Sequence, residues 1–307
     1  MSITFTVAPP GRRHRPLRLA EAMRLGPTGL RPYFQPEENG GSEELERYAG
    51  RKTDEIISRL GISPYSGRGF EFTYQQGAYT VRVLTPSAPN DWRIALDFLS
   101  ALARHFGASV VAENGDNFTA ETITSFDYSG DIRAGLMAFL RSLESGNPAI
   151  LVQGVNVDVS LNREILDHIF RSDSPANAFG DFVGPPQHTD AHFASQMAAR
   201  APDGSIQGLY TLTEGVDTVL PHSPTLPPHI RQQVGQESPV DWELALVGID
   251  GPDDDPESFS SLGAVDFAAA FRALPPRKVS RFDADRIYIR GLNRADIRAL
   301  LDSGRGA

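Results

Sequence analysis

The chain of 307 residues contains no cysteine, which excludes disulfide bonds, thiolate metal ligands and cysteine nucleophiles. Lysine is nearly absent, because Lys52 and Lys278 are the only two, so a lysine nucleophile has few candidates. The N-terminal residues include no apolar run of ~7–15 residues that would serve as the core of a signal peptide. No later segment approaches the ~20 apolar residues of a membrane span. We therefore expect a soluble, cytoplasmic, bacterial-type protein without a membrane partner.

The charge balance argues against a nucleic-acid-binding surface. The formal net charge is -10, whereas binding to phosphate groups needs a positive field. The most basic cluster, residues 11–15, is interpreted as a solvated loop, with a contact to phosphate or to an acidic partner as the alternative. Hydrophobic residues make up 40% of the chain and aromatic residues 9%, which is typical of a folded globular protein.

Residues 79–113 carry the clearest periodic pattern in the chain. Residues 79–85 alternate apolar and polar side chains, as a strand with one buried face does. Between residues 92 and 106 the apolar side chains recur at steps of three and four, which predicts a helix with Leu99 on its buried face. A β-branched run follows at 110–112. We expect a βαβ unit whose helix covers a sheet.

The ends of this helix have recognisable signals. Ser87 or Asn90 is the candidate N-cap, and the charge of Asp91 suits the positive end of the helix dipole. Gly107 is expected to end the helix in a left-handed conformation.

Further elements are expected on both sides of this unit. Residues 70–74 are predicted to form a hairpin with residues 79–85 through Gln76 and Gly77. Strand 2–7 and a short helix at 17–25 are predicted upstream. A helix beginning at Ser42 is predicted to carry an apolar stripe as far as Leu60.

The second half of this region suggests a repeat of the helix and strand order. A helix at 132–143 precedes extended residues at 149–152, which predicts a second half-copy on the same sheet. Ser160 is the expected cap of a helix at 161–170. Residues 171–186 are rich in turn formers.

The C-terminal part mixes the two kinds of element. A helix is predicted at 186–200, followed by a hairpin of residues 206–213 and 216–220. Residues 221–239 contain five prolines and are interpreted as a long loop, either a lid or an interaction arm. The remaining predictions are strands at 242–249 and 286–290, a helix at 264–274, and a last helix from Asn293 to residue 301.

These elements predict an α+β fold (mixed α/β), with βαβ-type units whose helices pack on a mixed sheet and a smaller C-terminal α+β lobe. We expect an N-terminal α/β lobe at 1–170, a connecting segment at 171–185 and the C-terminal lobe at 186–307. A single intertwined domain is the alternative.

The strongest candidates for chemistry are His188, Asp190 and His192. On the predicted helix, the step of four residues places His188 and His192 on one face, a spacing at which both can bind one metal ion. Asp190 would point to the other side, and no glutamate follows His188. Two ligands do not complete a coordination sphere, so solvent-facing histidines are favoured over a metal site. His222 and His229 are the nearest candidates for a third ligand.

The most acidic patch lies at residues 250–257. Pro252 and Pro256 interrupt it, and three consecutive aspartates do not alternate as the ligands of a calcium loop do. We interpret this patch as a solvated loop.

Three segments carry a resemblance to a bacterial family. They are residues 1–5 (MSITF), residues 67–71 (GRGFE) and residues 81–87 (VRVLTPS), the last followed by Asp91 and Trp92. Over its whole length the chain resembles domain of unknown function 4299. The resemblance implies a single-family protein without an assigned activity, and it transfers no catalytic residue.

Two functions of different classes remain open from the sequence. The favoured one is a non-enzymatic interaction protein that uses its acidic face and residues 221–239 to bind a protein partner, with no cofactor. The alternative is a metal-assisted hydrolase built on His188 and His192, with Asp190 or a distant carboxylate completing the site.

Overall fold

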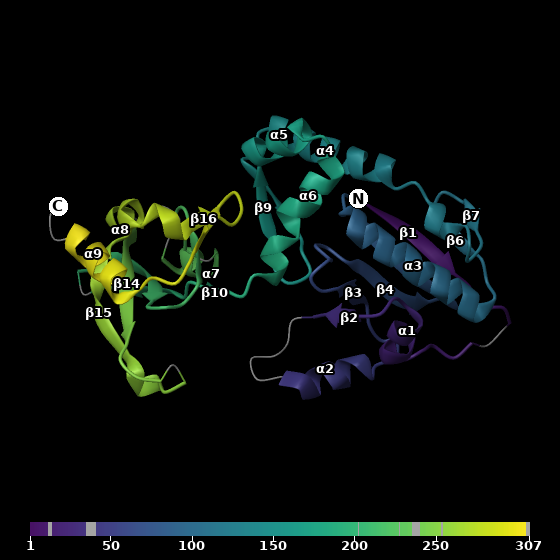
Figure 1. Cartoon of the computed structure of the whole chain (residues 1–307), viewed down its shortest axis with the longest axis horizontal. Coiled ribbons are helices and arrows are strands. Elements are labelled where there is room, and N and C mark those ends of the chain that lie inside the picture. Colours follow the sequence, from purple (N-terminus) through teal and green to yellow (C-terminus); the bar gives the residue numbers. More distant parts are fainter. Residues whose placement is uncertain are drawn as a thin grey trace. The chain divides into compact units, whose positions relative to one another are not determined.

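A computed structural model divides the chain into two compact units, residues 1–189 and residues 190–307, each with its own strands and helices (Figure 1). The fold is α+β, as predicted. The structure describes residues 1–11, 14–34, 41–201, 203–226, 228–234, 240–252 and 254–304.

The first seven described strands of the first unit form one sheet, in the order β2-β3-β4-β5-β1-β6-β7. All neighbouring strands in it are antiparallel. The bounds are β1 (Ser2–Val7), β2 (Leu30–Tyr33), β3 (Ser58–Ile62), β4 (Phe70–Gln75), β5 (Ala78–Leu84), β6 (Val110–Ala112) and β7 (Asn117–Phe118).

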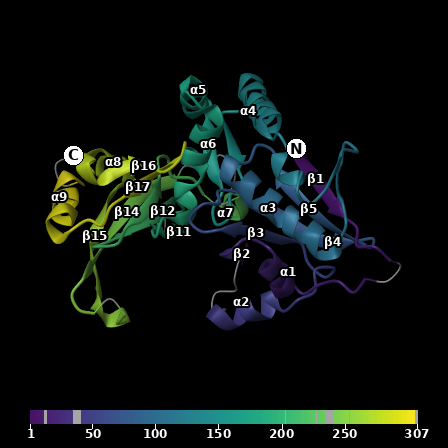
Figure 2. The same ribbon diagram turned by 45° about the vertical axis from the view of Figure 1, so that its right-hand side comes forward.

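The predicted βαβ unit is present as β5, α3 (Pro89–Phe106) and β6. Strand β1 pairs antiparallel with both β5 and β6, so these two strands run parallel with β1 between them. Figure 2 shows α3 lying along the sheet, and α3 contacts β1, β3, β5 and β6. Trp92 and Leu99 are both 0% exposed on the face of the helix that meets the sheet, which confirms the predicted buried stripe.

The two ends of α3 differ in how well the sequence predicted them. Ala88 is the N-cap and its side chain makes no capping bond, so the choice of Ser87 or Asn90 was wrong. Pro89 follows at the first helical position, where its fixed φ suits the helix and its missing N–H costs nothing. Gly107 ends the helix with φ 59°, as predicted.

The predicted hairpin joins β4 and β5 through Gln76 (φ 52°) and Gly77 (φ 84°). Two successive left-handed residues match the right-handed twist of the paired strands. In contrast, the helix predicted from Ser42 to Leu60 is wrong in its second half. Helix α2 (Gly41–Ala49) stops before Gly50, and Leu60 lies fully buried in β3 instead.

Besides α2, the described α-helices of the first unit outside the βαβ unit are α1 (Leu19–Leu25), α4 (Ser129–Glu144), α5 (Arg163–Arg171) and α6 (Pro175–Val183). The second half-copy predicted on the same sheet is wrong, because β8 (Ala149–Val152) and β9 (Val159–Asn162) pair antiparallel in a sheet of their own. The link between them is too short for the crossover that parallel strands require. Asn162, rather than Ser160, caps α5 through a bond from the N–H of Ile165. Residues 175–183, expected to be turns, form α6.

The described strands of the second unit form two four-stranded sheets, β10-β13-β17-β16 and β11-β12-β14-β15. Each sheet is mixed, with one parallel pair, β10 with β13 and β12 with β14. The bounds are β10 (His192–Phe193), β11 (Gln196–Arg200), β12 (Ile206–Thr213), β13 (Thr218–Pro221), β14 (Val240–Ile249), β15 (Phe259–Asp266), β16 (Val279–Arg281) and β17 (Arg286–Ile289).

A shared core holds these sheets to α8 (Phe267–Ala273) and α9 (Arg294–Gly304). Leu244, Leu246 and Leu300 are among its fully buried members. Asn293 caps α9 by accepting the N–H of Asp296 at 2.9 Å, as the sequence predicted.

Three predictions for this unit were wrong. The helix at 186–200 is replaced by the short 3-10 helix η2 (Pro185–His188), β10 and β11, because pairing of β11 with β12 overrides the helix preference of its alanines. Strands β12 and β13 lie in different sheets and form no hairpin. The proline-rich segment contains α7 (Pro228–Val234), while residues 227 and 235–239 lie outside the described residues.

Candidate functional site

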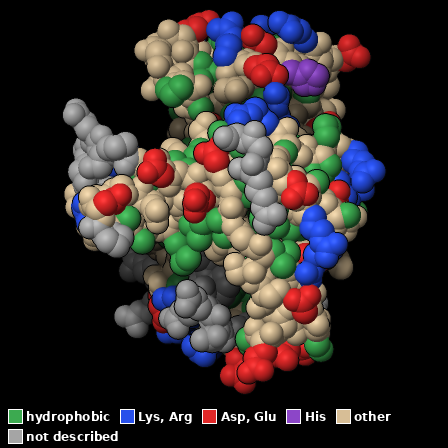
Figure 3. All heavy atoms as spheres, turned by 90° about the vertical axis from the view of Figure 1, so that its left-hand side faces the viewer, with side chains coloured by type: hydrophobic (Ala, Val, Ile, Leu, Met, Phe, Trp, Pro, Cys, Tyr) green, Lys and Arg blue, Asp and Glu red, His purple; other side chains and the backbone are tan. Residues whose placement is uncertain are grey.

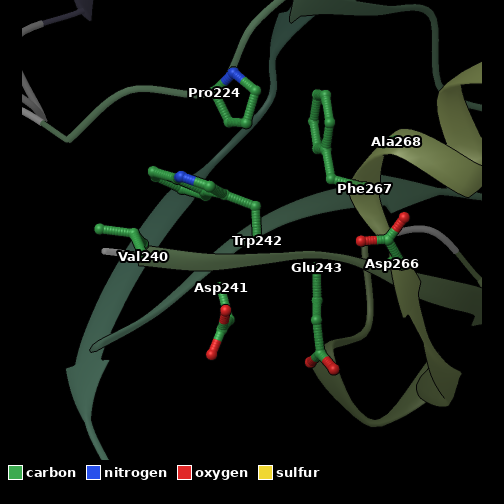
Figure 4. Close-up of a pocket in the computed structure, with 8 residues that line it drawn as sticks. All are labelled: Pro224, Val240, Asp241, Trp242, Glu243, Asp266, Phe267 and Ala268. Carbon is green, nitrogen blue, oxygen red and sulfur yellow. The ribbon is translucent and has the colours of Figure 1, made fainter. Parts of the chain in front are cut away.

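A pocket of about 520 Å³ lies in the second unit at the beginning of β14 (Figure 4). Its apolar wall is formed by Pro224, Trp242 and Phe267, and its acidic wall by Asp241, Glu243 and Asp266. This volume is within the range of ~300–1,000 Å³ that is usual for ligand pockets.

The two walls follow from the alternation of side chains along a strand. Trp242 lies on one side of β14, and its neighbours Asp241 and Glu243 point to the other side (Figure 4). Asp241 and Glu243 are exposed, whereas Trp242 is partly buried against the core of the unit. The order Asp-Trp-Glu therefore places an apolar and an acidic surface on opposite sides of the same strand.

Trp242 is held in place by its neighbours on β12. Its ring stacks on Tyr210, with the ring centroids 5.4 Å apart, and Tyr210 also contacts Phe267 at 5.8 Å. A Cβ atom on Gly208 would come within 2.4 Å of the Trp242 ring, so only glycine leaves room for it. Burial raises the pKa of Tyr210, whose hydroxyl hydrogen-bonds to the backbone of Thr225.

Among the residues that the structure describes, no strand pairs with β14 at the pocket on the side away from β12, and we call this side of residues 240–242 its open edge. Strand β15 pairs with β14 only as far as Asp266, which lies opposite Glu243. The chain then turns into α8, where Asp266 caps the helix by accepting the N–H of Ala269 at 2.8 Å. Residues 240–242 consequently pair with β12 on one side, while β15 does not extend to them on the other.

The charge of the pocket has one sign. Among the described residues that line it, three are acidic and none is basic. Within the described part of the chain, Asp241 and Glu243 take part in no ion pair, although other acidic residues of this unit do, such as Asp250 with Arg294 at 2.8 Å. Figure 3 shows further acidic side chains at the lower end of the drawn face, at the height of the turn between β14 and β15.

A second pocket, of about 440 Å³, lies in the first unit beside the start of α3. Arg93, Asp181 and His188 are among its lining residues, so it contains both signs of charge. His188 Nε2 donates to the carbonyl oxygen of Ser66 at 2.9 Å, and its Nδ1 lies 3.3 Å from the hydroxyl of Ser63. Both ring nitrogens therefore contact groups of the loop between β3 and β4.

The helix that was predicted to place His188 and His192 on one face does not form. His188 ends η2 in the first unit, whereas Asp190 and His192 belong to the second unit, where His192 begins β10. His192 Nε2 lies 3.3 Å from the hydroxyl of Ser195. Throughout the described residues, no group of three or more histidine, aspartate and glutamate side chains is placed to hold a metal ion. The metal site stays a prediction.

The other residues considered from the sequence have local roles or lie outside the described part. The ring centroid of His222 lies 5.5 Å from that of Phe271. Asp250 accepts bonds from Ser260 and Arg294. The side chain of His229, residues 12 and 13 of the basic cluster, residues 35–40, residue 253 of the acidic patch and residues 305–307 lie outside what the structure describes.

Sequence reasoning missed two buried ionisable residues near the start of α3, Asp91 and Arg68. Asp91 is 0% exposed and accepts the backbone N–H groups of Arg68 at 3.0 Å and Gly69 at 2.8 Å. Burial raises the pKa of Asp91 to about 6 and lowers that of Arg68 to about 10. The guanidinium of Arg68 donates to the carbonyl oxygens of Gln153 and Pro86. The bonds of Asp91 join α3 to the loop before β4, and the bonds of Arg68 join that loop to two other loops, so both residues have a structural role.

The fold and the two pockets define an α+β protein with an acidic, aromatic-walled pocket in its second unit. The chain belongs to the family described as Domain of unknown function (DUF4299), which matches residues 2–300. No curated protein and no solved structure is similar enough to match the chain. Within the described residues, every helix is too short or too polar to cross a bilayer.

Proposed function

We propose that this chain is a non-enzymatic interaction protein whose second unit binds a positively charged segment of a partner protein at the Trp242 pocket. The observation that carries the proposal is the combination of an apolar wall with three carboxylates, with no basic residue among the described residues that line the pocket. Binding sites in proteins commonly combine an aromatic anchor with charge complementarity, which speeds association and selects the partner.

The first described part of the proline-rich segment supports this role. Pro224 forms part of the pocket wall, and Leu226 is 7% exposed. The carbonyl oxygen of Thr225 accepts a hydrogen bond from Gln196 Nε2. Pro224 thus belongs to a segment held in place beside the site, as an interaction surface requires, and this supports the arm interpretation over that of a lid.

The experiment is affinity capture from extracts of the source organism with the full-length chain. One bait carries Asp241→Asn with Glu243→Gln, and a matched control carries Asp254→Asn with Glu257→Gln, which removes the same charge from exposed positions at the β14–β15 turn. We expect one stoichiometric partner that the wild type and the control retain and the pocket variant loses. The partner, once purified, should form a one-to-one complex with the wild type. A partner retained equally by the pocket variant, or none at all, would refute the proposal.

A further inference from the structure

We infer that the partner segment binds as an added β-strand along the open edge of β14, with alternating basic and apolar side chains. This inference rests on the proposed function and specifies the chemistry of the partner. It follows from the place where β15 stops, from the apolar and acidic walls on the two sides of β14 there, and from the charge of the acidic wall.

The open edge of β14 would hold the partner segment in an extended conformation. β14 continues for Val240, Asp241 and Trp242 beyond the last residue that pairs with β15. The pocket occupies the position into which β15 would continue if it did not turn into α8. An extended peptide placed there would complete the sheet through backbone hydrogen bonds, which is a common mode of peptide recognition.

The two walls give the segment its pattern. Side chains of an extended peptide alternate between the two sides of a sheet. On one side they would meet Trp242 and Phe267, and on the other Asp241 and Glu243 (Figure 4). Apolar side chains therefore suit the first side, and basic side chains suit the second. A segment of alternating arginine and valine satisfies both walls at once.

Tryptophan gives a built-in reporter for this site. The chain contains two tryptophans, Trp92 and Trp242. Trp92 is 0% exposed in the core of the first unit, so it serves as the internal control. Full-length protein labelled with 5-fluorotryptophan should give two fluorine NMR signals, assigned with the Trp242→Phe variant.

The probe is an acetylated and amidated hexapeptide of alternating arginine and valine. We expect it to shift the Trp242 signal saturably, to leave the Trp92 signal unmoved, and to bind at least fivefold more tightly than a peptide of three arginines followed by three valines. Equal binding of the two peptides, or no shift at Trp242, would overturn the inference.

Backbone methylation tests the strand pairing itself. Alternate residues of an added strand direct their N–H groups to the same edge, so methylating the nitrogens of the arginines or those of the valines blocks opposite edges. One of these two peptides should lose binding at least tenfold, and the other should retain it. If both peptides bind like the parent, the segment does not bind as a strand.

The outcomes separate the inference from the proposed function. A cellular partner that depends on Asp241 and Glu243, combined with hexapeptides that do not bind, leaves the function standing and removes the strand model of the ligand. A hexapeptide that binds as expected, combined with no partner in extracts, removes the proposed function and leaves the peptide site.

Discussion

The carboxylate of Asp91 accepts the backbone N–H of Gly69 at 2.8 Å inside the first unit. The bond joins the start of α3 to the loop that leads into β4. Gly69 has φ 61°, and a Cβ atom there would lie 2.3 Å from the carbonyl oxygen of Leu60, so this position requires glycine. The segments that carried the family resemblance around Gly69 and Asp91 are therefore in direct contact.

The ionisation of Asp91 should make the stability of the first unit depend on pH. Burial raises its pKa from 3.8 to about 6, so the folded state binds this proton more tightly than the unfolded state does. Its contribution to the free energy of unfolding is greatest below pH ~4 and is lost as the pH rises through about 6. The difference between the two pKa values corresponds to about 3 kcal/mol of unfolding free energy.

The measurement is urea unfolding between pH 4 and pH 7.5, followed by the fluorescence of Trp92 in a Trp242→Phe background. The decrease in unfolding free energy across this range should be smaller in Asp91→Asn than in the parent by about 2.4 kcal/mol, because the unfolded state is already partly ionised at pH 4. Asp97→Asn, at an exposed position on the same helix, is the matched control and should keep the parent's profile. Parallel profiles for Asp91→Asn and the parent would contradict the stated effect of burial.

Leu99→Ala should destabilise the first unit by about 3 kcal/mol, because removing a fully buried leucine side chain leaves a cavity. The same urea titration measures this loss. Asp97→Ala, on the exposed face of α3, should change stability by less than ~0.5 kcal/mol. Equal effects of the two substitutions would show that α3 does not cover the sheet through its leucine face.

The regions that the sequence predicted well have strong local signals. The step of three and four residues around Leu99 and the left-handed pair Gln76-Gly77 each specify one local conformation, and both are present. At 186–200 the local preference was misleading, because the strand formed by residues 196–200 depends on pairing with the distant β12. The hydrogen bonds of Asp91 likewise depend on a loop more than 20 residues away, which local patterns do not reveal.

Gly208→Ala tests how Trp242 is positioned. The added methyl group would come within 2.4 Å of the Trp242 ring, so the ring must move. We expect a loss of about 1 kcal/mol in the stability of the second unit and at least a tenfold weaker interaction with the captured partner, measured by calorimetry. The control is Gly130→Ala, which has open space around the added atom. Unchanged partner binding in Gly208→Ala would show that Trp242 is not an anchor.

Charge should contribute to partner binding mainly through the association rate. Asp241 and Glu243 are exposed, so neutralising each one should weaken binding by about two- to fivefold. Raising the salt concentration from about 50 to 500 mM should slow association of the wild type, because salt screens exposed charges. Surface plasmon resonance of the Asp241→Asn, Glu243→Gln variant should show a weaker salt dependence. An identical salt dependence in both proteins would contradict the role of the acidic wall.

The sequence contained part of the signal for this pocket. Asp241, Trp242 and Glu243 alternate as strand residues do. The acidic residues on both sides of the tryptophan indicate that one face of the strand is exposed to solvent at its beginning. Pro224 and Phe267 could not be added from the sequence, because they reach the site from separate segments. In the same way, the four-residue step between His188 and His192 would place both on one face only if one helix contained both residues, and η2 ends at His188.

The most direct test of the binding role of β14 is hydrogen–deuterium exchange of the full-length chain with and without the captured partner. The proposed function predicts that complex formation slows exchange of the amides in residues 240–243 and leaves the amides of β5 in the first unit unchanged. Slower exchange confined to the first unit, with residues 240–243 unaffected, would contradict it.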